Sequence, residues 1–132
     1  MTDEEKARIE QERVRRIWEQ IRVVDQKIQE CNQVKETLVS YQGSLDGAIE
    51  SWESVNKTLH SDVRYTRIVT TDIFEGEMAN QLKSYMANVV ADIATGIADT
   101  KTLLQELTTQ IGALEKYANQ LKVERNYLMG QL

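Results

Sequence analysis

TTDIFEG, residues Thr70–Gly76, is the stretch that decides the fold of this chain. It separates two long stretches with helical patterning, in a sequence of 132 residues that contains no proline. Because proline is the residue that most strongly interrupts a helix, little else in the sequence forces one to end. We therefore expect the chain to reverse here and to form an all-α fold, a long antiparallel helical hairpin that resembles a coiled coil.

The turn segment contains residues suited to the start of a second helix. Asp72 can cap the free amide groups of the next turn, and Glu75 adds negative charge near the positive end of the helix dipole. Gly76 allows backbone conformations that other residues resist, and we expect Phe74 to close the end of the hairpin. The predicted elements are a helix over about residues 3–68, a turn over about 69–76 and a helix over about 77–130, in a single domain covering 1–132.

The first half carries a heptad pattern of apolar residues. Steps of three and four residues link Val14, Ile17, Ile21, Val24, Ile28 and Cys31, which is the a/d pattern of a coiled coil. The apolar pattern then restarts at Val34, Leu38, Tyr41, Leu45, Ala48, Trp52, Val55 and Leu59. The repeated step of three at Cys31 predicts a stammer, a local overwinding. A kink near Gly43–Gly47 is left open, and one continuous helix is favoured.

The second half carries a more regular apolar pattern. It follows Ile97, Thr100, Leu104, Leu107, Ile111, Leu114, Ala118, Leu121, Arg125 and Leu128, with an upstream extension through Met78, Leu82, Tyr85, Val89 and Ile93. Small residues around Ala94 and Gly96 let another helix approach closely or leave room for a large side chain. Counting back from the turn places Trp52 opposite Ala94 and leaves residues 1 to about 15 beyond the end of the second helix. We expect Trp52 to lie in the core.

Composition limits the classes of function. The formal net charge of −5 argues against nucleic acid, whose phosphates an acidic chain repels. No apolar run approaches the roughly 20 residues that a membrane-spanning helix needs, and no conventional signal peptide begins the chain. A single cysteine, Cys31, fits a reducing compartment. These features predict a cytoplasmic protein, and leave open its export with a partner by a route that needs no cleaved signal.

The sequence contains no constellation typical of catalysis. It has one histidine, His60, one cysteine and no glycine-rich phosphate loop, and no cluster has zinc-ligand spacing. Cys31 occupies a core position and His60 is interpreted as a solvated residue near a helix end. We expect no enzymatic activity, no catalytic residues, no cofactor and no metal.

Apolar residues beyond the heptad pattern widen the hydrophobic stripe, which favours a further helix from another chain. Trp18 is either a half-buried flanking residue or a binding anchor, since tryptophan is enriched at interface hot spots. Homo- and hetero-oligomers both remain open. The candidate partner interface comprises the tryptophans and the large aliphatic residues of both patterns: Trp18, Ile21, Ile28, Leu38, Trp52, Leu104, Leu107, Ile111, Leu114 and Leu121.

The helix, aromatic-x-Gly turn and second helix resemble the WXG superfamily, the small helical hairpins of type VII secretion. Phe74-Glu75-Gly76 stands where that family has Trp-x-Gly, and the residues up to Leu82 are similar to those of the small proteins encoded beside LXG-type toxins in Gram-positive bacteria. The resemblance implies an accessory protein, a targeting chaperone that binds the N-terminal helical domain of such a toxin or another small WXG-like protein.

This chain departs from the family pattern in two ways. Phe74 replaces the tryptophan, and neither Tyr117 nor Tyr127 is followed four residues later by an acid, as the family's export signal requires. A partner would then supply that signal. Two alternatives stay open: a self-associating coiled-coil scaffold or adaptor, and an immunity protein that binds the toxin's C-terminal part.

Overall fold

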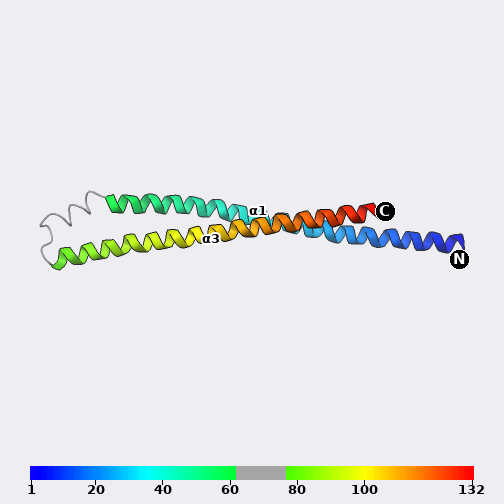
Figure 1. Ribbon diagram of the computed structural model, residues 1–132, viewed down its shortest axis with the longest axis horizontal. Coiled ribbons are helices and arrows are strands. Elements are labelled where there is room, and N and C mark those ends of the chain that lie inside the picture. The colour runs from blue at the N-terminus through cyan, green and yellow to red at the C-terminus, as the bar shows by residue number, and fades with distance from the viewer. Residues whose placement is uncertain (62–76) are drawn as a thin grey trace. The chain divides into compact units, whose positions relative to one another are not determined.

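The computed structural model describes residues 1–61 and 77–132. Helix α1 (Asp3–Ser61) and helix α3 (Glu77–Gly130) pack against each other in opposite directions (Figure 1). The expected all-α helical hairpin is confirmed. The predicted turn residues Asp72, Phe74, Glu75 and Gly76 lie outside the described residues, as do residues 62–68 of the expected first helix.

The chain divides into two compact units. Unit 1 comprises Met1–Ser40 and Thr108–Leu132, and unit 2 comprises Tyr41–Leu107. Each unit therefore pairs one part of α1 with one part of α3.

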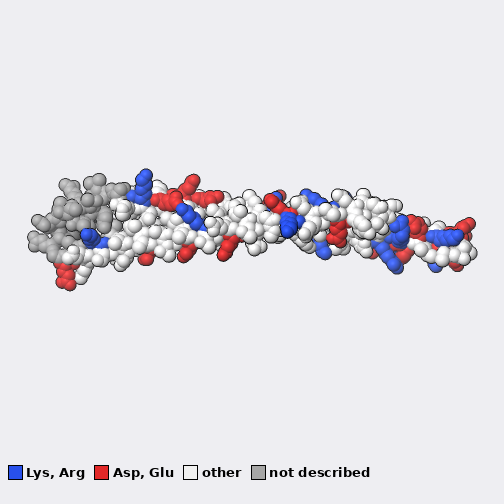
Figure 2. Space-filling model, in the orientation of Figure 1, with Lys and Arg blue, Asp and Glu red and all other residues white. Residues whose placement is uncertain are grey.

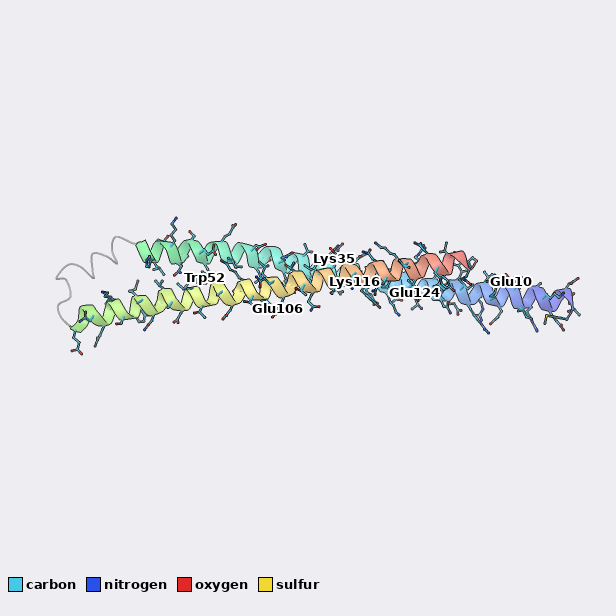
Figure 3. All side chains as sticks on the ribbon, viewed as in Figure 1. Glu10, Lys35, Trp52, Glu106, Lys116 and Glu124 are labelled. Carbon is cyan, nitrogen blue, oxygen red and sulfur yellow. The ribbon has the colours of Figure 1, made fainter. Side chains whose placement is uncertain are left out.

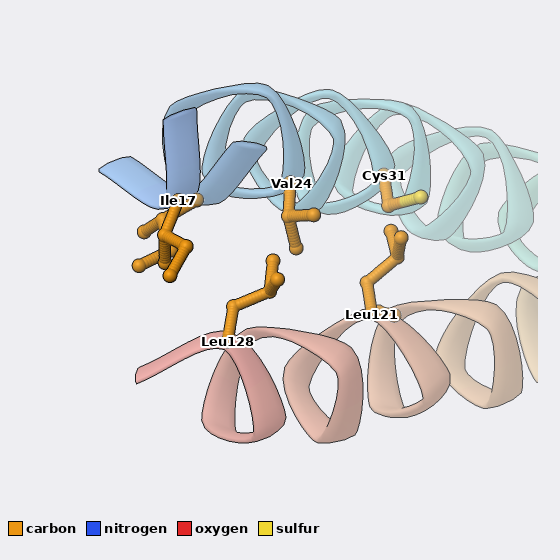
Figure 4. Close-up of a cluster of buried hydrophobic side chains, with 7 residues drawn as sticks. Ile17, Val24, Cys31, Leu121 and Leu128 are labelled. Carbon is orange, nitrogen blue, oxygen red and sulfur yellow. The ribbon is translucent and has the colours of Figure 1, made fainter. Parts of the chain in front are cut away.

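Unit 1 holds the main hydrophobic core. Val24 and Cys31 of α1 face Leu121 and Leu128 of α3 (Figure 4). Ile28 and Leu114 pack against this cluster, whose buried members are Ile17, Ile21, Val24, Cys31, Ala118, Leu121 and Leu128. Cys31 is a buried free thiol, so the prediction that it is a small core residue is confirmed.

The N-terminal end of α1 extends past the end of α3. The Arg13 guanidinium donates a hydrogen bond of 2.7 Å to the backbone carbonyl of Gln131, next to the end of α3. Ion pairs within α1 surround this contact, including those of Arg15 with Glu12 at 2.7 Å and with Glu19 at 2.9 Å. Hydrogen bonds from Arg13 and Arg15 hold the pKa values of Glu10 and Glu12, respectively, below the usual value for a glutamate.

The core pattern of α1 differs from the expected one after Cys31. Val34, Tyr41 and Val55 were expected in the core but are exposed. The partly or fully buried residues run Lys35, Leu38, Gln42, Leu45, Ile49, Asn56 and Leu59, and Ala48 is partly buried as expected. The step from Cys31 to Lys35 is four residues, which continues the seven-residue repeat, so the predicted stammer is wrong. The repeat passes through polar residues, which an apolar pattern cannot reveal.

Helix α1 is also continuous through the two glycines. It runs as a single α-helix from Asp3 to Ser61, so Gly43 and Gly47 do not break it. Glycine in a helix interior costs about 1 kcal/mol relative to alanine, and packing along α3 is sufficient to keep the helix intact.

The core pattern of α3 follows the prediction from Ile97 to Leu128, where every expected position is partly or fully buried. Upstream, Tyr85 was expected in the core but is exposed, and Met86 is partly buried in its place. Met86 lies seven residues before Ile93, so α3 keeps the same repeat in this direction.

Replacing Leu121 by alanine tests the unit 1 core. Leu121→Ala removes a side chain that is 4% exposed, and we expect it to lower the free energy of unfolding by about 3 kcal/mol. Val123→Ala, on the same helix but exposed, should change it by less than about 0.5 kcal/mol. Urea unfolding followed by circular dichroism measures both, and equal effects would contradict the assigned core.

Acid should selectively weaken the N-terminal turns of α1. The pKa values of Glu10 and Glu12 are lowered in the folded helix. Their contribution is therefore complete above the unfolded pKa and is lost as the pH falls through the folded pKa. Lowering the pH from about 7 to about 3 should reduce the 13Cα secondary shifts of residues 5–16 more than those of the unit 1 core. In the double variant Glu10→Gln/Glu12→Gln, these shifts should depend less on pH. If the shifts of residues 5–16 in the unsubstituted protein do not change with pH, the two ion pairs do not stabilise these turns.

Candidate partner-binding surface

The seven-residue repeat assigns each side of the hairpin in unit 2. Core positions of α1, such as Ile49 and Asn56, have a neighbouring column of residues on each side. In an antiparallel helix pair, matching columns from the two helices meet on the same side of the core. One side of unit 2 therefore combines Asp46 and Glu53 with Lys101, and the other combines Ala48 and Val55 with Gly96 and Leu103.

The first of these surfaces, here called the charged flank, comprises Asp46, Glu53 and Lys101. The Lys101 ammonium lies 2.8 Å from a Glu53 carboxylate oxygen and so joins α3 to α1 on this side. A hollow on the same side is lined by Asn56, Lys57, His60 and Val90 together with Glu53 and Ile97. This ion pair shows that the column of α1 containing Glu53 and the column of α3 containing Lys101 lie on the same side of the core. It is exposed, so its own contribution to stability is small.

The second surface, here called the uncharged flank, comprises Ala48, Val55, Gly96 and Leu103. Val55 is 44% exposed and Leu103 is 46% exposed. The next column of α1 outward from the core is also free of charge and consists of Ser44, Ser51 and Thr58, all exposed. Within unit 2, the described part of α1 thus has charged residues on one side and none on the other.

Trp52 lies next to the uncharged flank, beside an open groove (Figure 3). Trp52 was expected in the core, but it is 54% exposed. The groove has a volume of about 330 Å³ and is lined by Ile49, Trp52, Asp92, Ile93, Gly96, Ile97 and Thr100. A Cβ added to Gly96 would meet nothing within 4 Å, so the space that the small residue leaves is not filled by the tryptophan.

Polar residues occupy core positions of α1 that face α3. Lys35, in unit 1, reaches Glu115 at 2.9 Å. In unit 2, the Oδ1 atom of Asn56 is buried and has no hydrogen-bond partner within the described part of the chain. A buried polar atom without a partner costs about 1–3 kcal/mol. The packing of α1 against α3 in unit 2 is therefore less stable than it would be with an apolar residue at position 56.

Most residues of the candidate partner interface are partly or fully buried within the hairpin itself. Ile21 and Leu121 are buried in unit 1, and Ile28 and Leu114 pack against them. Leu38, Leu104, Leu107 and Ile111 are partly buried along the same pattern. Trp18, at 47% exposed, and Trp52 are the two members left mainly accessible.

The sequence predicted close approach at Gly96 and a wide apolar stripe, but it did not combine Val55, Leu103 and Asp92 with Gly96 into one surface. Each was read along one helix, whereas the surface exists only where columns of two helices meet. The sequence does contain one indication of this surface. Between Tyr41 and Ser61, the charged residues of α1 all lie on the side of Glu53, and the column of Ser44, Ser51 and Thr58 has none. His60 is exposed, as expected.

Neither α1 nor α3 contains a segment long and apolar enough to cross a membrane. Across residues 1–61 and 77–132, no group of three or more histidine, cysteine, aspartate or glutamate side chains is placed to hold a metal ion. In comparisons with known proteins, no family model, no curated protein and no solved structure matches the chain.

Replacing Asn56 by leucine should stabilise the hairpin. The change removes a buried oxygen without a partner and adds apolar area to the core, so we expect the free energy of unfolding to rise by about 1–2 kcal/mol. The matched control Asn88→Leu, at an exposed position of α3, should stay within about 0.5 kcal/mol. Thermal and urea unfolding measure both variants. A loss of stability in Asn56→Leu would show that the oxygen has a partner.

Proposed function

We propose that this chain is a non-enzymatic, partner-binding helical hairpin. The observation that carries the proposal is the exposure of Trp52, Val55 and Leu103 around an open groove in unit 2. Apolar and aromatic residues at this density on one side of a helix pair are typical of a surface that another helix covers. A half-exposed tryptophan beside a groove is also the usual composition of an interface hot spot.

More specifically, the partner is the N-terminal helical domain of an LXG-type toxin, and the hairpin acts as its targeting chaperone for type VII secretion. The support for this identity is the sequence resemblance at Phe74-Glu75-Gly76, together with the helical hairpin itself. The partner would then complete the core that unit 2 leaves open and would supply the export signal absent near Tyr117 and Tyr127.

The second candidate is a self-associating coiled-coil scaffold or adaptor. The same exposed residues favour it, because two copies could cover each other's groove and form a four-helix bundle. The two candidates differ in what the isolated chain does in solution. A chaperone awaiting a toxin has its groove open, whereas a scaffold fills it with a second copy.

Co-expression with the N-terminal domain of an LXG-type toxin encoded beside this chain tests the proposal directly. We expect the two proteins to co-elute as one complex in size-exclusion chromatography, and Trp52→Ala to weaken that complex by about 2 kcal/mol. The matched control Tyr127→Ala removes an aromatic side chain that is exposed on α3 in unit 1, away from the groove, and should leave binding unchanged.

Three outcomes separate the candidates. Two soluble proteins that elute separately would contradict the chaperone role. A stable homo-oligomer of the isolated chain, seen by light scattering, would favour the scaffold. Binding to the C-terminal half of the toxin and not to the N-terminal half would identify an immunity protein instead.

A further inference from the structure

We propose that the uncharged flank of unit 2 docks a helix whose apolar stripe is bordered by lysine or arginine on the side that meets α3. This inference rests on the proposed partner-binding role and deepens it, because it states which side of the hairpin binds and what charge the partner carries. The juxtaposition that supports it is an apolar groove with a row of carboxylates along one border and hydroxyl groups along the other.

The apolar part of this surface lies on the side opposite the ion pair. Trp52, Val55 and Leu103 are each between 44% and 54% exposed. The groove beside Trp52 passes over Gly96, where the backbone of α3 is open to close approach by another helix. Helix packing of this kind needs small residues at the crossing point and large residues around it. The surface has both.

A row of carboxylates borders the groove on the α3 side. Asp92 lines the groove, and Asp99 and Glu106 follow at intervals of seven residues on the same face of the helix. All three are exposed, and Glu106 points away from α1 (Figure 3). Carboxylates are spaced along this outer edge of α3 (Figure 2). Within the part of the chain that the structure describes, none of the three forms an ion pair.

The opposite border, on α1, carries no charge. Ser44, Ser51 and Thr58 follow at the same interval of seven residues and present small hydroxyl side chains. A helix lying in the groove would therefore meet negative charge along one edge only. Charge complementarity at such an edge favours a partner with basic residues on that edge and fixes its orientation.

The described part of a second copy of unit 2 brings few basic residues. The lysines among its described residues are Lys57, Lys83 and Lys101, and Lys101 is paired with Glu53 on the charged flank. Packing α3 of one copy on α3 of another would bring two rows of carboxylates together, which is unfavourable. The surface therefore favours a basic helix over a second copy of unit 2 as its occupant.

The test uses two synthetic helical peptides with the same leucine and alanine stripe, bordered by lysine in one and by glutamate in the other. The full chain carries Trp18→Phe, so that Trp52 alone reports binding by its fluorescence. We expect the lysine peptide to bind saturably and to shift the Trp52 emission to shorter wavelength as the indole leaves water. The glutamate peptide should not bind, and raising the salt concentration should weaken the lysine peptide.

A matched pair of double variants isolates the row of carboxylates. Asp92→Asn/Glu106→Gln removes two charges from the border of the groove, and Asp46→Asn/Glu50→Gln removes the same two charge types from the other side of unit 2. The first should weaken the lysine peptide about fivefold, as expected for two exposed ion pairs. The second should have no effect beyond about 1.5-fold, which reflects only the change in net charge. Circular dichroism checks that both remain helical.

Several results would overturn the inference. Absence of binding by the lysine peptide, equal binding of the two peptides, or equal weakening by the two double variants would each do so. A stable homodimer of the unchanged chain in which Trp52 is already shielded would identify a second copy as the occupant and would also overturn it. If an LXG domain binds but is insensitive to both double variants, this inference fails while the proposed function stands. If the lysine peptide behaves as expected but no LXG domain binds, the proposed function fails instead.

Discussion

The structure depends on a seven-residue repeat that is never interrupted in the described part of either helix. In α1 it runs from Val14 through Cys31, Lys35 and Ile49 to Leu59, and in α3 from Met86 to Leu128. Two helices in contact must keep such a repeat, because a residue placed one position off turns by about 100° away from the partner helix. The hairpin keeps this repeat even where the residue at a core position is polar, as at Lys35 and Asn56. The exposure of the apolar residues beside those positions follows from this.

The cost of keeping the repeat is concentrated in the second half of α1. Asn56 is held against α3 with a buried oxygen that lacks a partner, while Val55, its apolar neighbour, faces water. A helix that served only the stability of this hairpin would place the valine against α3 and the asparagine in water. The exposed apolar residues are therefore better explained by contact with another helix than by the stability of the hairpin. In unit 1, by contrast, apolar residues such as Ile21, Val24 and Leu121 are buried in one cluster.

Much of the fold could be predicted from the sequence, and the failures have a common cause. The hairpin, the pattern from Ile97 to Leu128 and the burial of Cys31 required only apolar spacing along one helix, and these predictions are confirmed. The core of α1 beyond Cys31 was wrong because Lys35, Gln42 and Asn56 continue the repeat without being apolar. Trp52 was placed in the core, but the absence of a side chain at Gly96 leaves it beside an open groove. The uncharged flank could not be found from either helix alone, since it forms only where the two meet.

The central claim is that α1 turns Asn56 toward α3 and Val55 toward water. Thiol reactivity measures this directly, using Val55→Cys and Asn56→Cys, each combined with Cys31→Ser so that one thiol is present. The account predicts that the thiol introduced at position 55 reacts rapidly with a maleimide reagent and that the one at position 56 reacts several times more slowly. Faster reaction at position 56 than at position 55 would place the apolar column in the core and would contradict both the register and the partner-binding surface derived from it.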